Sequence, residues 1–160
     1  MRTRWLAVVA LASASAALPA CEAPGYEPPE AERRIELADS LYSPALFDTI
    51  QWPSEEQRAT AGNLVYADFC RRCHGPVGEG GVVEVAGQQI PVPSLVAAEW
   101  RLAADTEAVR QRIFTGHVGG MPSWGISRLT PREIDAVAFY VQELLRPEML
   151  EAPPPVDWGG

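Results

Sequence analysis

The segment Cys70-Arg-Arg-Cys73-His74 constrains the fold of this 160-residue chain more than any other feature. Two intervening residues let one turn of chain present both thiols side by side, and the histidine follows directly. This spacing is the attachment motif of c-type haem, in which the thiols bond to the two vinyl groups and a neutral imidazole nitrogen ligates the iron. The motif therefore predicts a haem site, provided that the rest of the chain fits a haem pocket.

Two other chemistries use such a pair of cysteines. A closed zinc site needs two further Cys or His ligands, and His117 is the one remaining histidine, without a partner at a zinc-finger spacing. A thioredoxin-like dithiol expects a strand before the motif, whereas the residues before Cys70 have a helical pattern. An accidental match is the third alternative, which only the rest of the chain can test.

A little over half of the chain resembles the class I cytochrome c family. Members have a first helix reading Gly-x-x-x-aromatic-x-x-x-Cys, which matches Gly62, Tyr66 and Cys70. An aromatic residue of their last helix crosses that glycine, because a residue without a side chain permits close approach of the backbones. Tyr140 fits this role, with Phe139 as second choice. The resemblance implies an all-α fold, with about three to five helices wrapped around one covalently bound haem c and an extended N-terminal arm.

The resemblance also implies the iron ligands and the loops that carry them. Family members have a Pro-x-Leu loop whose proline carbonyl accepts the imidazole N–H of the proximal histidine, and Pro93-Ser94-Leu95 matches it. A glycine-rich turn followed by Met-Pro-x-aromatic supplies the sixth ligand, here Met121. Cys70 and Cys73 are thus the implied attachment residues, and His74 and Met121 the axial ligands. We expect apolar walls for the pocket, from Leu64, Ile113, Trp124 and Leu129.

The first twenty residues read as an export signal, with Arg2 and Arg4 ahead of an apolar run. That run, 5–18, is shorter than the roughly 20 apolar residues that span a bilayer. The tetrapeptide ending at Cys21, Leu-Pro-Ala-Cys, resembles the bacterial lipobox, so Cys21 is a candidate lipid anchor. The alternative is cleavage further upstream, which leaves Cys21 as a thiol. We expect an exported protein, in the periplasm or on the outer face of the cytoplasmic membrane.

Composition divides the chain into four parts. We expect a signal peptide over 1–20, a Pro-rich tether and partly apolar arm over 21–55, a cytochrome c domain over 56–146 and a Pro/Gly-rich tail over 147–160. The apolar part of the arm should pack on a surface. Whether that surface belongs to this domain or to another subunit stays open.

Local signals place the helices of the domain. Helices are predicted over 54–70 and 105–115, and from Thr130 onward, where Thr-Pro-Arg-Glu combines an N-cap, a first-turn proline and a capping-box glutamate. Pro147 is predicted to end the last helix. A short helix is predicted near Ser94 or Leu95, and a small hairpin over 82–90.

The net charge of the chain restricts the classes of partner that it can bind. The chain has 13 Arg and no Lys against 21 Asp and Glu, and removal of the signal takes away two of the arginines. Such an acidic protein is unsuited to nucleic acid, and its charge would speed its encounter with a basic partner. The resemblance to cytochromes c implies that its partners are redox proteins. The main hypothesis is a membrane-tethered electron carrier rather than an enzyme. The alternatives are a permanent mono-haem subunit of a larger membrane oxidoreductase complex, and an enzyme or gas sensor in which Met121 leaves the iron on reduction.

Overall fold

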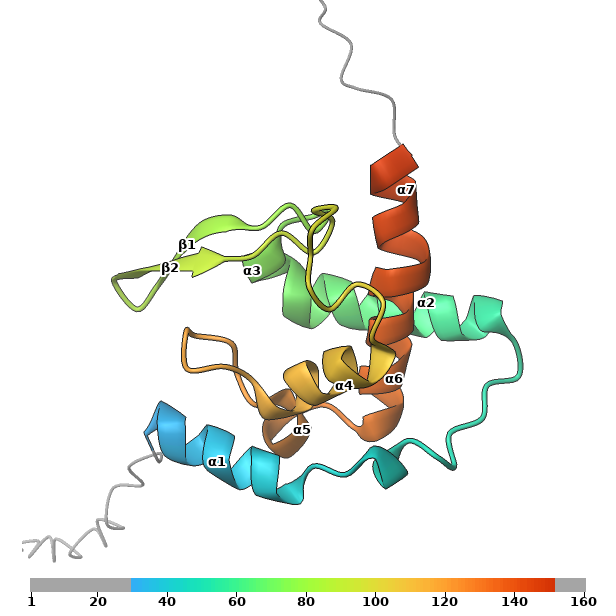
Figure 1. The fold of residues 1–160 in the computed structure, drawn as a ribbon, viewed down its shortest axis with the longest axis horizontal. Helices are drawn as coiled ribbons and strands as arrows, with labels where there is room; N and C mark the ends of the chain where they lie inside the picture. The colour runs from blue at the N-terminus through green and yellow to red at the C-terminus, as the bar shows by residue number, and fades with distance from the viewer. Residues whose placement is uncertain (1–29, 152–160) are drawn as a thin grey trace, which may run out of the picture.

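The computed structural model describes residues 30–151, which form a set of helices and one two-stranded hairpin (Figure 1). The predicted export signal, Cys21 and residues 152–160 of the predicted tail lie outside the described residues. None of the helices within 30–151 has the length and apolar character of a membrane span. In chain order the elements are α1 (Ala31–Leu41), the 3₁₀ turn η1 (Pro44–Leu46), α2 (Glu55–Val65), the π-helical η2 (Tyr66–Cys70), α3 (Arg71–His74), β1 (Gly81–Val85), β2 (Gln88–Val92), α4 (Thr106–Thr115), α5 (Trp124–Ser127), α6 (Pro131–Tyr140), the π-helical η3 (Val141–Leu145) and α7 (Arg146–Glu151).

Two continuous helical runs, α2 to α3 and α6 to α7, cross each other and form the frame of the domain (Figure 1). Their starts are fixed by caps: Ser54 Oγ accepts the backbone N–H of Gln57, and Thr130 forms the predicted capping box with Glu133. The backbones meet at Gly62, where a Cβ atom would lie 2.2 Å from the Ala136 carbonyl oxygen. A side chain at this position would force the helices apart.

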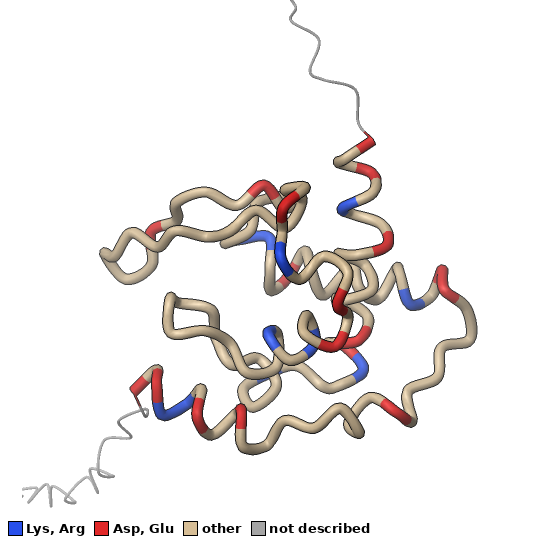
Figure 2. Tube along the Cα trace, in the orientation of Figure 1, with Lys and Arg blue, Asp and Glu red and all other residues tan. Residues whose placement is uncertain are grey.

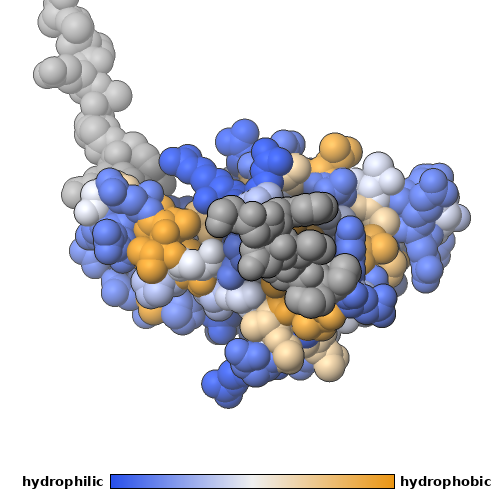
Figure 3. Space-filling view, turned by 90° about the horizontal axis from the view of Figure 1, so that it is seen from above, coloured by the Kyte–Doolittle hydropathy of each residue, from blue (hydrophilic) through white to orange (hydrophobic). Residues whose placement is uncertain are grey.

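The core lies between this frame and α4. α4 begins after Asp105, whose carboxylate accepts the N–H of Ala108, and buries Val109, Ile113 and Phe114. The facing side of α6 and η3 is almost wholly buried, through Ile134, Val137, Ala138, Val141 and Leu145. Apolar residues also remain at the surface, in patches among hydrophilic side chains (Figure 3).

The N-terminal arm packs on this domain, which answers the question that the sequence left open. Ala38 and Phe47 are buried in the core, and the Tyr42 ring meets Phe114 edge to face with centroids 5.5 Å apart. Trp52 Nε1 donates to Asp135 at 2.7 Å, and the guanidinium of Arg132 stacks 3.8 Å above the Trp52 ring. The arm is therefore attached along its length from α1 to α2.

Two predictions of local structure are wrong, and one helix was not predicted. Residues 31–41 form this additional helix, α1, and residues 95–104 form turns instead of a short helix. Pro147 does not end the last helix, which continues to Glu151. The π-helical η3 ends at Leu145, two residues before this proline, and a widened turn can move aside the carbonyl that a proline ring would strike in an α-helix. The predicted hairpin is present, as β1 and β2.

Candidate haem site

The two cysteines lie where η2 passes into α3. Cys70 ends the π-helical turn and Cys73 follows within α3, and both thiols are free and partly buried. π-Helical turns often mark functional sites, because the extra residue re-aims the side chains that follow. Burial, with a smaller contribution from Cys73, raises the pKa of the Cys70 thiol to about 12. Without a bound group, Cys70 is thus a protonated thiol at neutral pH.

His74 ends α3 and is held toward the strand β2. Its Nδ1 lies 3.4 Å from the carbonyl oxygen of Pro93, at the long end of a hydrogen bond. Burial lowers the pKa of His74, while the Pro93 carbonyl acts in the opposite sense. Burial, the larger effect, favours a neutral imidazole, and the Pro93 carbonyl favours the tautomer with its proton on Nδ1, which leaves Nε2 free to bind a metal.

The loop between His74 and Pro93 is closed by backbone contacts. Gly80 N donates to the His74 carbonyl at 2.9 Å, and Leu95 N donates to the Gly78 carbonyl at 2.8 Å. A Cβ atom at Gly80 would lie 2.5 Å from the Val92 carbonyl oxygen, so the two ends of the hairpin are in close contact there. The phenol of Tyr66 donates to the Gly75 carbonyl at 2.7 Å and ties this loop to the helix frame.

Met121 lies on the loop between α4 and α5, which Figure 1 shows opposite α3 and the hairpin. Its N–H donates to the His117 carbonyl and its own carbonyl accepts the His117 N–H, at 3.1 and 2.9 Å, which makes a narrow antiparallel bridge. Ser123 Oγ donates to the Thr115 carbonyl at 2.7 Å and fixes the return of the loop to α4. Met121 is half-buried against the core, while the His117 side chain is exposed.

The expected pocket walls differ in their surroundings. Trp124 packs edge to face on Phe69, the residue before Cys70, with centroids 5.5 Å apart. Ile113 and Leu129 are buried in the core, but Leu64 is 62 % exposed. Leu64 therefore does not contribute to an apolar wall in this structure.

One residue that helps to shape the site was not found from the sequence. Arg146 is buried at the start of α7, and its guanidinium donates to the carbonyls of Leu95 and Ala97 at 2.7 and 2.8 Å. It thereby positions the chain that follows Pro93. Arg146 lies four residues after Gln142, which is buried. Residues at this spacing share a helix face, so this position was the available indication that Arg146 is buried as well.

The electrostatic surroundings of the cysteines are more basic than the chain as a whole. Figure 2 shows acidic residues at intervals along most of the described trace. Arg71 and Arg72, between the cysteines, are exposed, and the Arg128 guanidinium lies 5.7 Å from the centre of the Phe69 ring. Within residues 30–151, no three His, Cys, Asp or Glu side chains are grouped to bind a metal ion. The zinc alternative therefore lacks a ligand set in this part of the chain.

Comparison with known proteins decides the family. Residues 57–141, more than half of the chain, match the family model described as cytochrome C oxidase, cbb3-type, subunit III. The chain belongs to this cytochrome c family. Cytochromes c carry covalently bound haem c, so haem binding through thioether bonds is a property of the family.

Two relatives of this cytochrome are subunits of the same kind of oxidase. The cbb3-type cytochrome c oxidase subunit CcoP of Rhodobacter capsulatus is 35% identical over 130 residues, which cover 72% of this chain and 42% of the relative. The corresponding subunit FixP of Bradyrhizobium diazoefficiens is 34% identical over 86 residues, or 54% of this chain and 27% of the relative. The cytochrome thus spans less than half the length of these relatives. No solved structure matches it.

The residues of the site fit haem c. Two thiols with two residues between them can add to two vinyl groups, and an imidazole whose pKa is lowered by burial follows them directly. The aromatic pair of Phe69 and Trp124 supplies an apolar surface beside them. A half-buried thioether from another loop completes a set of donors that is soft and neutral, as ferrous haem prefers.

Proposed function

We propose that this chain is an electron-transfer subunit that binds one haem c through Cys70 and Cys73, with His74 and Met121 as axial ligands. The observation that carries the proposal is the arrangement of the paired thiols with His74 directly after them, its Nδ1 lying 3.4 Å from the Pro93 carbonyl oxygen. When bound, the haem supplies an iron that gains and loses one electron. The protein supplies the attachment, the orientation of the imidazole and an apolar surrounding.

Each residue has a physical role in this proposal. The thiols of Cys70 and Cys73 fix the group at one edge, so that it does not dissociate. The Pro93 carbonyl fixes the plane and tautomer of the imidazole. The Met121 thioether is neutral and favours the ferrous state, which raises the reduction potential relative to a second histidine. With both axial positions filled by protein atoms, the site favours electron transfer over reactions with small molecules.

The relatives favour permanent assembly over free diffusion. Both relatives described above are named as subunits of a cbb3-type cytochrome c oxidase. We therefore favour the hypothesis of a permanent subunit over that of a tethered free carrier. The partners would be the donor and acceptor of electrons in a membrane oxidase, on the periplasmic side of the membrane, with Cys21 as the lipid attachment residue.

The first experiment is an absorption spectrum of protein matured in a compartment with haem-attachment machinery. We expect a c-type spectrum that survives acid-acetone extraction, and a sulfur-to-iron charge-transfer band in the oxidised protein. Met121→Ala should abolish this band. Met149→Ala, the control, should retain it, because Met149 lies in α7 and packs against the core. Extractable haem, or a band that survives Met121→Ala, would contradict the ligation proposed here.

A second experiment separates the subunit from the carrier. The protein is solubilised from its native membrane in mild detergent and purified through an affinity tag. Stoichiometric recovery of integral membrane subunits supports the permanent subunit, whereas a lone monomer supports the carrier. The Cys21→Ser variant, expressed alone, should move to the soluble fraction; membrane retention unchanged by this substitution would refute the lipid anchor.

A further inference from the structure

The β1–β2 hairpin has two distinct faces. Val83 and Ile90 stand opposite each other in the antiparallel register, so their side chains share one face, and both are half-buried. The other face carries Val82, which is 67 % exposed, and the exposed Glu84. The hairpin therefore directs one apolar surface toward the rest of the domain.

That apolar face contacts the loop that carries Met121. A Cβ atom at Gly120 would lie 2.7 Å from Ile90 Cδ1, so the isoleucine side chain rests directly on the Gly120 backbone. Gly120 has φ +107° and immediately precedes Met121. Glycine is favoured here for two reasons. A positive φ is strained for residues with a side chain, and a side chain at this position would collide with Ile90.

The same strand reaches the His74 side of the site. β2 ends at Val92, and the next residue is Pro93, whose carbonyl faces His74 Nδ1. The base of the hairpin is fixed there by the close contact of Gly80 with Val92. One short strand thus connects the residue that orients the imidazole to the loop that presents the thioether.

We propose that the β1–β2 hairpin is a clamp that positions Met121, with Ile90 as the positioning residue. The inference rests on the ligation proposed above. The loop from Gly116 to Met121 contains three glycines, and its hydrogen bonds are local: His117 and Met121 exchange two, and His117 also accepts the N–H groups of Gly119 and Gly120. Ile90 adds a contact from a distant part of the chain. A neutral thioether is a weak ligand, and its bond to the iron depends on how well the loop is held. Ile90 raises the population in which the sulfur is in place.

The test compares Ile90→Ala with Val82→Ala on the opposite face of the same hairpin. The readouts are the amplitude of the sulfur-to-iron band against temperature, the fraction of reduced protein that binds carbon monoxide, and the reduction potential. For Ile90→Ala we expect about a tenfold rise in the fraction of molecules without the sulfur ligand, the size expected from deleting part of a half-buried aliphatic side chain. Its potential should fall, and Val82→Ala should match the wild type.

Ile90→Val removes Cδ1 but keeps Cγ2, which would also lie 3.2 Å from a Cβ atom at Gly120, so its readouts should lie between those of Ile90→Ala and the wild type. Equal readouts for Ile90→Ala and the wild type would overturn the clamp, as would equal losses in Ile90→Ala and Val82→Ala, which would indicate general weakening of the hairpin. A wild-type protein without the sulfur-to-iron band would refute the proposed ligation instead. The two failures are therefore distinguishable.

Discussion

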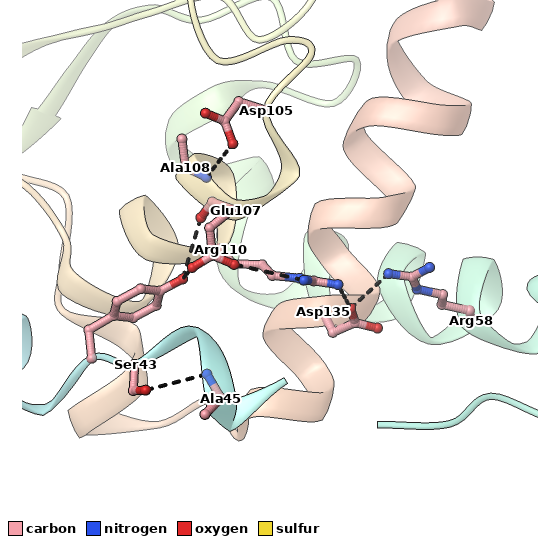
Figure 4. Close-up of polar contacts among 9 residues, drawn as sticks. Ser43, Ala45, Arg58, Asp105, Glu107, Ala108, Arg110 and Asp135 are labelled. Atoms are coloured by element: carbon pink, nitrogen blue, oxygen red, sulfur yellow. Dashed lines mark hydrogen bonds and ion pairs between the residues drawn. The ribbon is translucent and has the colours of Figure 1, made fainter. Parts of the chain in front are cut away.

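At the scale of single residues, Asp135 joins more segments than any other side chain described above (Figure 4). It is buried on α6, and its carboxylate accepts hydrogen bonds from Arg58 of α2 at 2.7 Å, from Arg110 of α4 and from the Trp52 indole at 2.7 Å. Two guanidinium groups and one indole N–H satisfy this buried charge. The carboxylate therefore links α2, α4 and the arm to α6.

Removal of this charge should destabilise the whole domain. Asp135→Asn leaves two largely buried guanidinium groups without their anion, and we expect a loss of about 3 kcal/mol in the free energy of unfolding. The measurement is denaturant unfolding of the haem-loaded protein. Asp68→Asn, an exposed residue of η2, is the control and should change stability little. A loss no larger than that of the control would show that the network contributes nothing to stability.

Tyr66 should make stability depend on alkaline pH. Burial raises the pKa of Tyr66 above its ordinary value of about 10. Above pH 10 the unfolded chain releases the phenolic proton while the folded chain keeps it, so stability falls as pH rises. Tyr42 and Tyr140, whose pKa values burial also raises, contribute in the same direction. Tyr66→Phe therefore removes the contribution of Tyr66 alone. It should cost about 1 kcal/mol at pH 8, where the bond to the Gly75 carbonyl is lost, and less at pH 11. Unfolding curves across this range would show a constant difference if the idea is wrong.

At the scale of elements, the crossing of α2 and α6 depends on the absence of one side chain. A Cβ atom at Gly62 would lie 2.6 Å from the Tyr140 Cβ as well as against the Ala136 carbonyl. Gly62→Ala should therefore destabilise the domain by about 2 kcal/mol, despite the better helix propensity of alanine. The adjacent exposed residue gives the control, since Asn63→Ala should be neutral or slightly stabilising. Equal stability of the two variants in thermal unfolding would exclude a tight crossing.

Features that depend on residues close together in the sequence were predictable, and features that depend on contacts between distant segments were not. The starts of α2, α4 and α6 were predictable because caps act within one turn, at Ser54, Asp105 and Thr130. The spacing of the haem motif is equally local. The continuation through Pro147 was not predictable, because it depends on a π-helical turn that local pattern does not reveal. Ile90 and Arg146 were missed because their contacts join segments distant in the sequence.

At the scale of the whole molecule, the arm is part of the folded unit. It contributes Ala38 and Phe47 to the core and Trp52 to the Asp135 network. A chain that begins at Ser54 should thus be less stable than one that begins at Glu30, by roughly the 2 to 5 kcal/mol that follow removal of large buried apolar side chains. Denaturant unfolding of the two truncated proteins, both haem-loaded, is the measurement. Equal midpoints would mean that residues 56–146 fold without help from the arm.

The attachment of the arm to the domain also shortens the chain that can act as a tether. α1 begins at Ala31, so only nine residues, 22–30, separate it from Cys21, and a lipid at Cys21, as proposed above, would hold the folded unit within at most about 35 Å of chain. Had the arm been unattached as far as residue 55, the reach would be roughly 120 Å. A domain held on so short a tether would remain close to the membrane surface. With the lipid proposed on Cys21, such a domain would therefore exchange electrons with partners in the same membrane rather than with partners far from it.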